Sequence, residues 1–266
     1  MMNLLQKFLS LFLADEGTYE PAGIPSVGYF ILMFVTFFCI YKALKKTLAY
    51  SYSHIRKIIR RMITVLWGLE IFKIGYRFYY GYASDLGTWV PLYFCSITLF
   101  AGLLSSFATG LLQHIGDVFI SVGGLIGGIC FLLYPSTSLL LFPAWHFLSL
   151  HSFLYHGSMV YLGILLNRSG MVELKKSDLK YYAGYVFVFC TLAQSLNMIF
   201  GSNLMFTNAP FEASVLVFMK VLGRFYTPFM FLVQMFVPFY VIMWFRKNTD
   251  LLTRPSWYPV FREKRS

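Results

Sequence analysis

Charged residues are scarce in this sequence, and acidic residues are the scarcest of them. Only 12% of the 266 residues are charged, with 11 aspartates and glutamates in all, whereas 58% are hydrophobic and 20% are aromatic. A soluble domain of this length could not bury so much apolar surface in one core. The composition therefore excludes a soluble globular protein. It predicts an all-α polytopic membrane protein, with residues 1–266 forming a single membrane domain.

Cysteine is also rare, and its spacing excludes two common uses. The four cysteines lie far apart within apolar stretches, at Cys39, Cys95, Cys130 and Cys190. This spacing matches neither a disulfide framework nor a paired zinc-binding motif. We expect no metal and no other cofactor, and packing is the ordinary role of such cysteines. Cys95 is the one that we consider for chemistry.

Long apolar runs are abundant, and seven of them have the roughly 20 residues that a membrane-spanning helix needs. They are residues 24–43, 62–80, 90–110, 117–134, 143–166, 181–200 and 225–245. The segment 1–20 is too short to span, and its large apolar residues fall on one helical face, which predicts an interfacial helix. Glycines four apart at 123/127 and 124/128 predict close helix packing.

The basic residues are distributed unevenly between the connections. They gather between the first two spans, after the fifth span and in the tail at 246–266, whereas the other connections hold mainly acids. By the positive-inside rule this places the N-terminus outside and the C-terminus in the cytoplasm of a multi-pass protein in the cell membrane. An odd number of spans is then required, which agrees with seven. The net charge of +11 indicates contact with membrane lipids rather than nucleic acid, and it leaves the oligomeric state open.

Ionisable residues inside a span are costly and therefore indicate function. Glu70, Lys73 and Arg77 lie on one helical face at i, i+3 and i+7. Glu70 and Lys73 are expected to pair within the helix. Arg77 either extends its guanidinium toward the outer surface or recognises a phosphate or carboxylate as a substrate-binding residue.

Three histidines lie five residues apart in "HFLSLHSFLYHGS", at His146, His151 and His156. A spacing of five rotates a helical side chain by about 140°, so the three imidazoles cannot face one point, and a tri-histidine metal site is disfavoured. A hydrogen-bonded structural role is the usual fate of such a histidine. Proton chemistry at one of them is the alternative.

The stretch from 201 to 224 is too polar for a full span and too apolar for an ordinary loop. Two placements are open: a loop on the outer surface, or a loop that dips into the bundle. In the second case the side chains of Asn197, Asn203 and Asn208 would line a cavity, since non-helical backbone at membrane depth needs polar partners.

Three motifs resemble one known family. "VPLYFC" at 90–95, "FLYHGSMVYLGILL" at 153–166 and "NMIFGSNLMFTNAP" at 197–210 resemble, in this order, the motifs of the YwaF-like bacterial integral membrane proteins. The resemblance covers residues 65 to 245. Tyr93 stands where that family commonly has histidine, and Leu204 where it commonly has tyrosine.

The YwaF-like family is similar to a mammalian transmembrane acyltransferase that remodels ether phospholipids through a cysteine and a histidine. The resemblance thus implies Cys95 as nucleophile and His156 as base, with Tyr93, Asn197 and Asn203 as parts of a polar substrate site. It also implies a lipid acyltransferase or acyl hydrolase. His151, which residue counting along the spans places nearer the depth of Cys95, is the reserve base. The competing hypothesis is a transporter, receptor or accessory protein whose polar cavity holds a small ligand.

Overall fold

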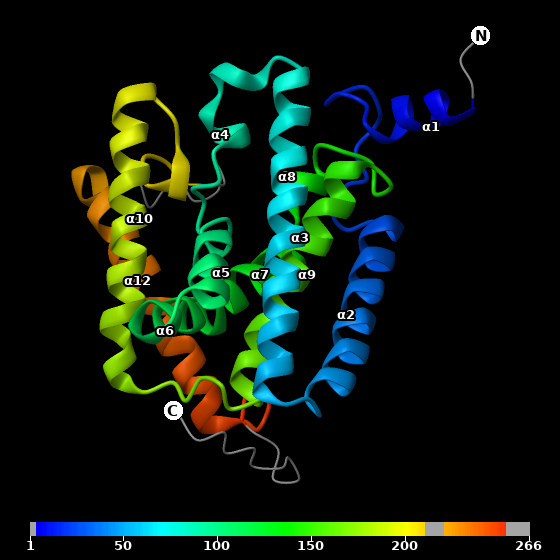
Figure 1. The fold of residues 1–266 in the computed structure, drawn as a ribbon. Coiled ribbons are helices and arrows are strands. Elements are labelled where there is room, and N and C mark those ends of the chain that lie inside the picture. Colours follow the sequence, from blue (N-terminus) through cyan, green and yellow to red (C-terminus); the bar gives the residue numbers. More distant parts are fainter. Residues whose placement is uncertain (1–3, 211–220, 254–266) are drawn as a thin grey trace.

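A computed structural model describes residues 4–210 and 221–253, and every regular element in these two ranges is helical (Figure 1). This confirms the predicted all-α class. The long helices are α2 (Val27–Thr47), α3 (Tyr52–Tyr79), α9 (Phe147–Arg168), α10 (Leu179–Phe200) and α12 (Tyr226–Asn248). A further long helix is continuous through α6 (Gly110–Phe119), the π-helical turn η2 (Ile120–Gly124) and α7 (Leu125–Leu133).

Shorter helices connect and flank these. They are α1 (Leu4–Phe12), η1 (Tyr82–Ser84), α4 (Leu86–Trp89), α5 (Thr98–Phe107), α8 (Ser136–Leu139), η3 (Lys176–Asp178), η4 (Leu204–Phe206) and η6 (Gly223–Phe225). The predicted interfacial helix thus corresponds to α1. Much of the predicted basic tail, and residues 211–220 of the polar stretch, lie outside the described residues.

Among the described residues, four helical segments are long and apolar enough to cross a membrane. These are Val27–Thr47, Gly110–Leu133, Lys176–Phe200 and Gly223–Asn248. They match the first, fourth, sixth and seventh predicted spans. The other three predicted spans are not supported by this measure. One lies in α3, which begins at Tyr52 and carries several basic residues. Another lies in α9, whose apolar residues are interrupted by two histidines and several hydroxyl side chains. The third contains, as its longest helix, only the ten residues of α5.

Helix α9 is the centre of the bundle, because nearly all of its faces are buried. Glycines allow its neighbours to approach. A Cβ atom on Gly128 of α7 would lie 2.8 Å from the carbonyl oxygen of His156, and one on Gly157 of α9 would lie 2.7 Å from Thr36 of α2. The expected packing role of the α7 glycines is therefore confirmed at Gly128, since only glycine permits this backbone approach.

A partly buried ion pair joins α3 to α6. Arg56 donates to both carboxylate oxygens of Asp117, at 2.7 and 2.9 Å. The same guanidinium donates to the carbonyl of Ser105 at the end of α5, whose hydroxyl donates to Asp117 at 2.6 Å. Bidentate geometry of this kind is the strong form of an arginine–carboxylate contact. Three helices are thereby held together at one end of the bundle.

At the opposite end, the chain that follows α1 is held by side chains of α3 and by His146. The hydroxyls of Tyr76 and Tyr80 donate to the carbonyls of Ala14 and Leu13. His146, whose Nε2 donates to Ala14 at 2.9 Å, accepts the backbone N–H of Leu148 at Nδ1. His146 is therefore the N-cap of α9, which is the structural role expected for a histidine in this segment.

Candidate functional site

The segment around Cys95 is not helical, which corrects the expectation of a continuous helix over 90–110. Residues 90–97 form an extended stretch and a turn, and helix α5 begins only at Thr98. Pro91 explains part of this break, because it restricts Val90 to extended backbone and supplies no N–H. Cys95 therefore lies in a turn inside the bundle rather than on a helical face.

The thiol of Cys95 lies against helix α7. Its Sγ donates to the carbonyl of Gly127 at 3.6 Å. A Cβ atom on Gly127 would come within 3.1 Å of this sulfur, so the glycine provides the space that the thiol occupies. The cysteine nevertheless retains partial exposure. The thiol is thus held in place against α7.

Tyrosine hydroxyls add a second hydrogen bond to each of three carbonyl groups in this turn, which also accept backbone N–H groups of α5. Tyr155 of α9 donates to the carbonyls of Cys95 and Ser96 at 3.2 and 3.5 Å. Tyr185 of α10 donates to the carbonyl of Ile97 at 2.7 Å. Non-helical backbone at this depth is tolerated only where protein groups satisfy it. Tyr155 and Tyr185 were not among the predicted site residues, although Tyr155 directly precedes His156 in the quoted motif.

Replacing Tyr155 with phenylalanine should loosen this turn. We expect a loss of about 1 kcal/mol of unfolding free energy for the lost bond, and faster labelling of Cys95 by a membrane-permeant maleimide. Mass spectrometry of the Cys95 peptide measures the labelling. Tyr161→Phe is the matched control, because its buried hydroxyl bonds Thr47 instead. Equal acceleration in both variants would contradict a specific role for Tyr155.

His156 has one nitrogen engaged and one available. Its Nδ1 is 2.8 Å from the carbonyl oxygen of Ser152, one turn earlier in α9. A carbonyl oxygen only accepts, so Nδ1 carries the proton and Nε2 presents a lone pair. The ring stacks on Phe131 of α7, with centroids 3.7 Å apart and planes 9° apart. The imidazole therefore has a fixed orientation, and the residue is partly exposed.

His151 belongs to a separate polar cluster with α3. Lys73 and Glu70 form the predicted pair, with Nζ and Oε1 2.6 Å apart. The other carboxylate oxygen of Glu70 is 3.9 Å from Nε2 of His151, which is buried and has no hydrogen-bond partner. The ring of His151 lies parallel to that of Tyr155 at 6.0 Å. This cluster thus adjoins the tyrosine that holds the Cys95 turn.

Neighbouring glycines of α7 lie against the Cys95 turn and against the backbone of α9 at His156. Gly127 contacts the sulfur of Cys95, and the next glycine, Gly128, faces the carbonyl of His156. Tyr155, which bonds the Cys95 carbonyl, directly precedes His156. No hydrogen bond joins Cys95 to a histidine among the described contacts. In the described ranges, no group of three or more His, Cys, Asp or Glu side chains is placed to hold a metal ion.

Arg77 contacts the N-terminal segment. Its Nη1 is 3.3 Å from a carboxylate oxygen of Glu16, and its guanidinium lies over the rings of Tyr82 and Phe142 at 5.1 and 5.7 Å. Burial, and then the hydrogen bond to Asp15, raise the pKa of Tyr82, so its hydroxyl remains the donor in that bond. Arg77 is thus engaged by a protein carboxylate at the end of the bundle where α1 lies.

Asn197 organises the polar loop that follows α10. Its amide nitrogen donates to the carbonyl of Leu204 and the hydroxyl of Thr207, both at 2.9 Å. Its amide oxygen accepts from the N–H of Leu204 and the hydroxyl of Ser202, both at 2.8 Å. Both N–H donors and both lone pairs of this buried amide are thereby bonded to the loop. Asn197 shapes the loop from within.

Asn203 has a similar position in the loop. Its amide oxygen accepts the N–H groups of Asn208 and Ala209, and its nitrogen donates to the carbonyl of Ala209 at 3.0 Å. The loop reaches inward, since Gln234 of α12 donates to the carbonyl of Met205, which is 1% exposed. Of the two placements left open for the stretch, residues 201–209 therefore adopt the one that dips into the bundle.

Tyr93 connects this loop to the Cys95 turn. Its ring lies 5.1 Å from that of Phe206, centroid to centroid, and the side chain is partly exposed. The carbonyl of Tyr93 accepts the N–H of Ile97 at 3.0 Å, which closes the turn that contains Cys95. The loop after α10 and the turn before α5 thus pack on each other beside the thiol.

Comparisons with known proteins give one match. The family model of the TMEM164 family matches residues 18–246. No curated protein and no solved structure matches the chain. The match agrees with the resemblance to a mammalian transmembrane protein, whereas the YwaF-like resemblance stays a prediction. The matched range contains the Cys95 turn, helix α9 and the polar loop, and it covers far more than half of the sequence. The chain therefore belongs to the TMEM164 family.

Proposed function

We propose that this membrane protein transfers or hydrolyses acyl groups of membrane lipids, with Cys95 as the nucleophile and His156 as the base. The observation that carries the proposal is the break in the helix at 90–97, which places Cys95, a partly exposed residue, in a turn inside the bundle. A structural cysteine would not require such a break or the tyrosines that stabilise it. The orientation of His156, with Nε2 available, supports the same assignment.

The proposed reaction has two steps. The sulfur of Cys95 attacks the carbonyl carbon of an acyl ester while Nε2 of His156 takes the thiol proton. The ester C–O bond then breaks, the leaving alcohol receives that proton, and a thioester remains on Cys95. A second alcohol attacks the thioester in transfer, and water attacks it in hydrolysis. In both cases His156 takes the proton of the attacking group and returns it to the sulfur.

Backbone N–H groups near Cys95 are available to stabilise the oxyanion. Within the described residues, no acceptor takes the N–H groups of Phe94, Cys95 and Ser96, which precede the first turn of α5. Unpaired N–H groups at the start of a helix suit a developing negative charge. We assign them to the tetrahedral intermediate. Asn197 and Asn203 contribute by shaping the loop that packs beside this turn.

The orientation in the membrane remains part of the proposal. We infer that all seven predicted segments lie within the membrane, with the N-terminus outside and the C-terminus in the cytoplasm of the cell. Support comes from Figure 1, where the connection from α2 to α3, the connection from α9 to α10 and the end of α12 lie at one end of the bundle. These are the places where the basic residues gather. A substrate would then reach Cys95 from the outer leaflet.

Two histidine variants test whether His156 or His151 is the catalytic base. His156→Gln should lower turnover by at least about 10²-fold, because general base catalysis is lost at the thiol. His151→Gln should retain most of the turnover, since His151 faces Glu70 rather than the sulfur. Initial rates in lipid nanodiscs measure both. The opposite ranking would transfer the role of base to His151.

The proposal is tested by measuring both the lipid products and the acyl group attached to Cys95. The purified protein in phosphatidylcholine nanodiscs is incubated with an ether lysophospholipid, and the lipids are analysed by mass spectrometry. Acyl transfer predicts a new diradyl ether lipid and a hydroxylamine-sensitive acyl group on the Cys95 peptide. Hydrolysis predicts free fatty acid instead. Tight retention of a lipid or small ligand without turnover would support the competing transporter or receptor class.

A further inference from the structure

A groove of about 380 Å³ runs between α2 and α9, away from the Cys95 turn. Its walls include Val35 and Cys39 of α2 and Phe153, Leu154 and Gly157 of α9. The only polar groups among its lining side chains are hydroxyls and one thiol, and none of the lining residues is charged. A groove of this chemistry suits a hydrocarbon rather than a polar solute.

The length of the groove matches one lipid chain. Its lining runs from Leu150 to Tyr161 along α9 and from Leu32 to Ala43 along α2. At 1.5 Å of rise per residue, each wall is roughly 16 Å long. This is about half of the ~30 Å hydrocarbon thickness of a bilayer, the depth that one acyl chain occupies in its leaflet.

The surroundings of the groove favour a lipid chain over water as its occupant. Helix α2 is a candidate membrane span, and residues on its outer side such as Phe30 and Phe34 are 61% and 71% exposed. The groove therefore lies at the depth of lipid tails. An apolar cavity left empty there would lose dispersion contacts on both walls, so an acyl chain is the occupant of lowest free energy.

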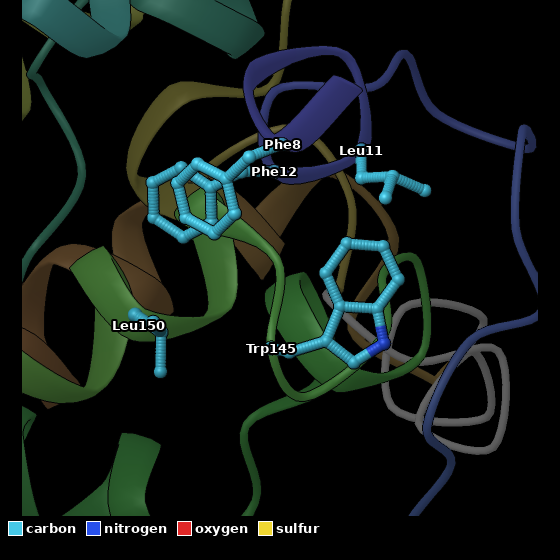
Figure 2. Close-up of a pocket in the computed structure, with 5 residues that line it drawn as sticks. All are labelled: Phe8, Leu11, Phe12, Trp145 and Leu150. Carbon is cyan, nitrogen blue, oxygen red and sulfur yellow. The ribbon is translucent and has the colours of Figure 1, made fainter. Parts of the chain in front are cut away.

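A second cavity shares Leu150 with the groove and lies at the end of the bundle where α1 is found. It measures about 400 Å³ and lies between α1 and the start of α9. Figure 2 shows Phe8, Leu11 and Phe12 of α1 on one side, with Trp145 and Leu150 on the other. Leu150 lines both cavities. Trp145 is of the residue type that marks the level of the lipid headgroups.

The groove is on a different face of α9 from the candidate active site. Leu150, Leu154, Gly157 and Tyr161 follow one another at intervals of three or four residues and line the groove. His151 and Tyr155, on the neighbouring stripe, face Glu70 and the Cys95 turn. A chain in the groove therefore does not place its ester at Cys95, and the site is independent of the proposed reaction.

We propose that the groove between α2 and α9 is a binding site for one acyl chain of a membrane phospholipid, reached past α1 and Leu150. The bound chain fills the interface between α2 and the central helix. Direct contacts there include Gly157 with Thr36 and the hydrogen bond from Tyr161 to Thr47. The lipid thereby links the packing of α2 to the composition of the surrounding membrane.

Photolabelling tests this site in the Cys95→Ala protein, so that the result does not depend on acyl transfer. The protein is reconstituted in phosphatidylcholine nanodiscs that contain a phosphatidylcholine with a diazirine on its acyl chain. After irradiation, peptide mapping is expected to find labels on both groove walls, residues 32–43 and 150–161. Labels confined to the exposed outer side of α2 would overturn the proposal.

A pair of tryptophan variants separates a bound chain from general lipid contact. Cys39→Trp fills the groove, whereas Ile31→Trp, two turns away on α2 and outside the groove lining, adds similar bulk to an exposed position. Labelling of residues 150–161 should fall about tenfold in Cys39→Trp, equivalent to about 1.4 kcal/mol of binding, and stay unchanged in Ile31→Trp. Ala43→Phe is a second variant whose side chain fills the groove. Thermal unfolding checks that each variant folds. Equal labelling in all variants would show annular lipid only.

Discussion

Replacing Cys95 with alanine should abolish acyl transfer, with a loss of at least about 10³-fold in turnover. Removing the nucleophile of a covalent mechanism leaves only substrate binding and oxyanion stabilisation, which retain a small residual rate. The fold should survive, because the sulfur makes one weak hydrogen bond, at 3.6 Å to Gly127. Initial rates in nanodiscs and the acyl group on the Cys95 peptide are the two measurements.

Cys130→Ala is the matched control for this experiment. Cys130 lies on α7, three residues after Gly127, and it is exposed. The Cys130→Ala variant should retain full turnover, since the proposed mechanism uses no second thiol. Undiminished turnover in Cys95→Ala would remove the catalytic proposal. The family membership and the all-helical fold would be unaffected by that result.

Replacing Asp117 with alanine should destabilise the protein by about 3 kcal/mol. The substitution leaves the guanidinium of Arg56 without its carboxylate, and an uncompensated buried charge typically costs 3–5 kcal/mol. The lower end applies because Arg56 keeps 20% of its side-chain surface exposed. The hydroxyl of Ser105 also loses its acceptor. Unfolding by SDS in mixed micelles, followed by circular dichroism, gives the free energy.

The double variant Arg56→Met with Asp117→Ala shows whether the stability lost in Asp117→Ala comes from the unpaired charge of Arg56. If the lost stability comes from the unpaired charge, removing that charge should restore at least half of it. A double variant as unstable as Asp117→Ala would instead attribute the loss to packing at the junction of α3, α5 and α6. Activity is not needed for either measurement, so this prediction is independent of the proposed function.

Local patterns predicted several features that the structure contains. The pairing of Glu70 with Lys73 follows from their i, i+3 spacing and is present at 2.6 Å. The glycine spacing in the fourth span predicted close packing, and Gly128 provides it against α9. Such features depend on residues within one helix or on one face of it. They can therefore be predicted before the fold is known.

The Cys95 turn could not be predicted in the same way. Its apolar composition indicates a helix, and the turn depends on hydroxyl groups that arrive from Tyr155 and Tyr185, 60 and 88 residues away. The three histidines illustrate the same limit. Their spacing indicated that they cannot converge, but only the contacts distinguish the N-cap His146 from His156, whose Nε2 is available.

The sequence by itself determined the helical class, the scarcity of charge that indicates a membrane protein, and the short list of polar residues in apolar segments. These follow from composition and from periodicity, which act over one or two helical turns. The tertiary structure alone decided which polar groups meet, where the helix before α5 breaks, and which face of α9 borders a groove. Those properties depend on hydrogen bonds and close packing between distant segments, whose partners no local pattern specifies.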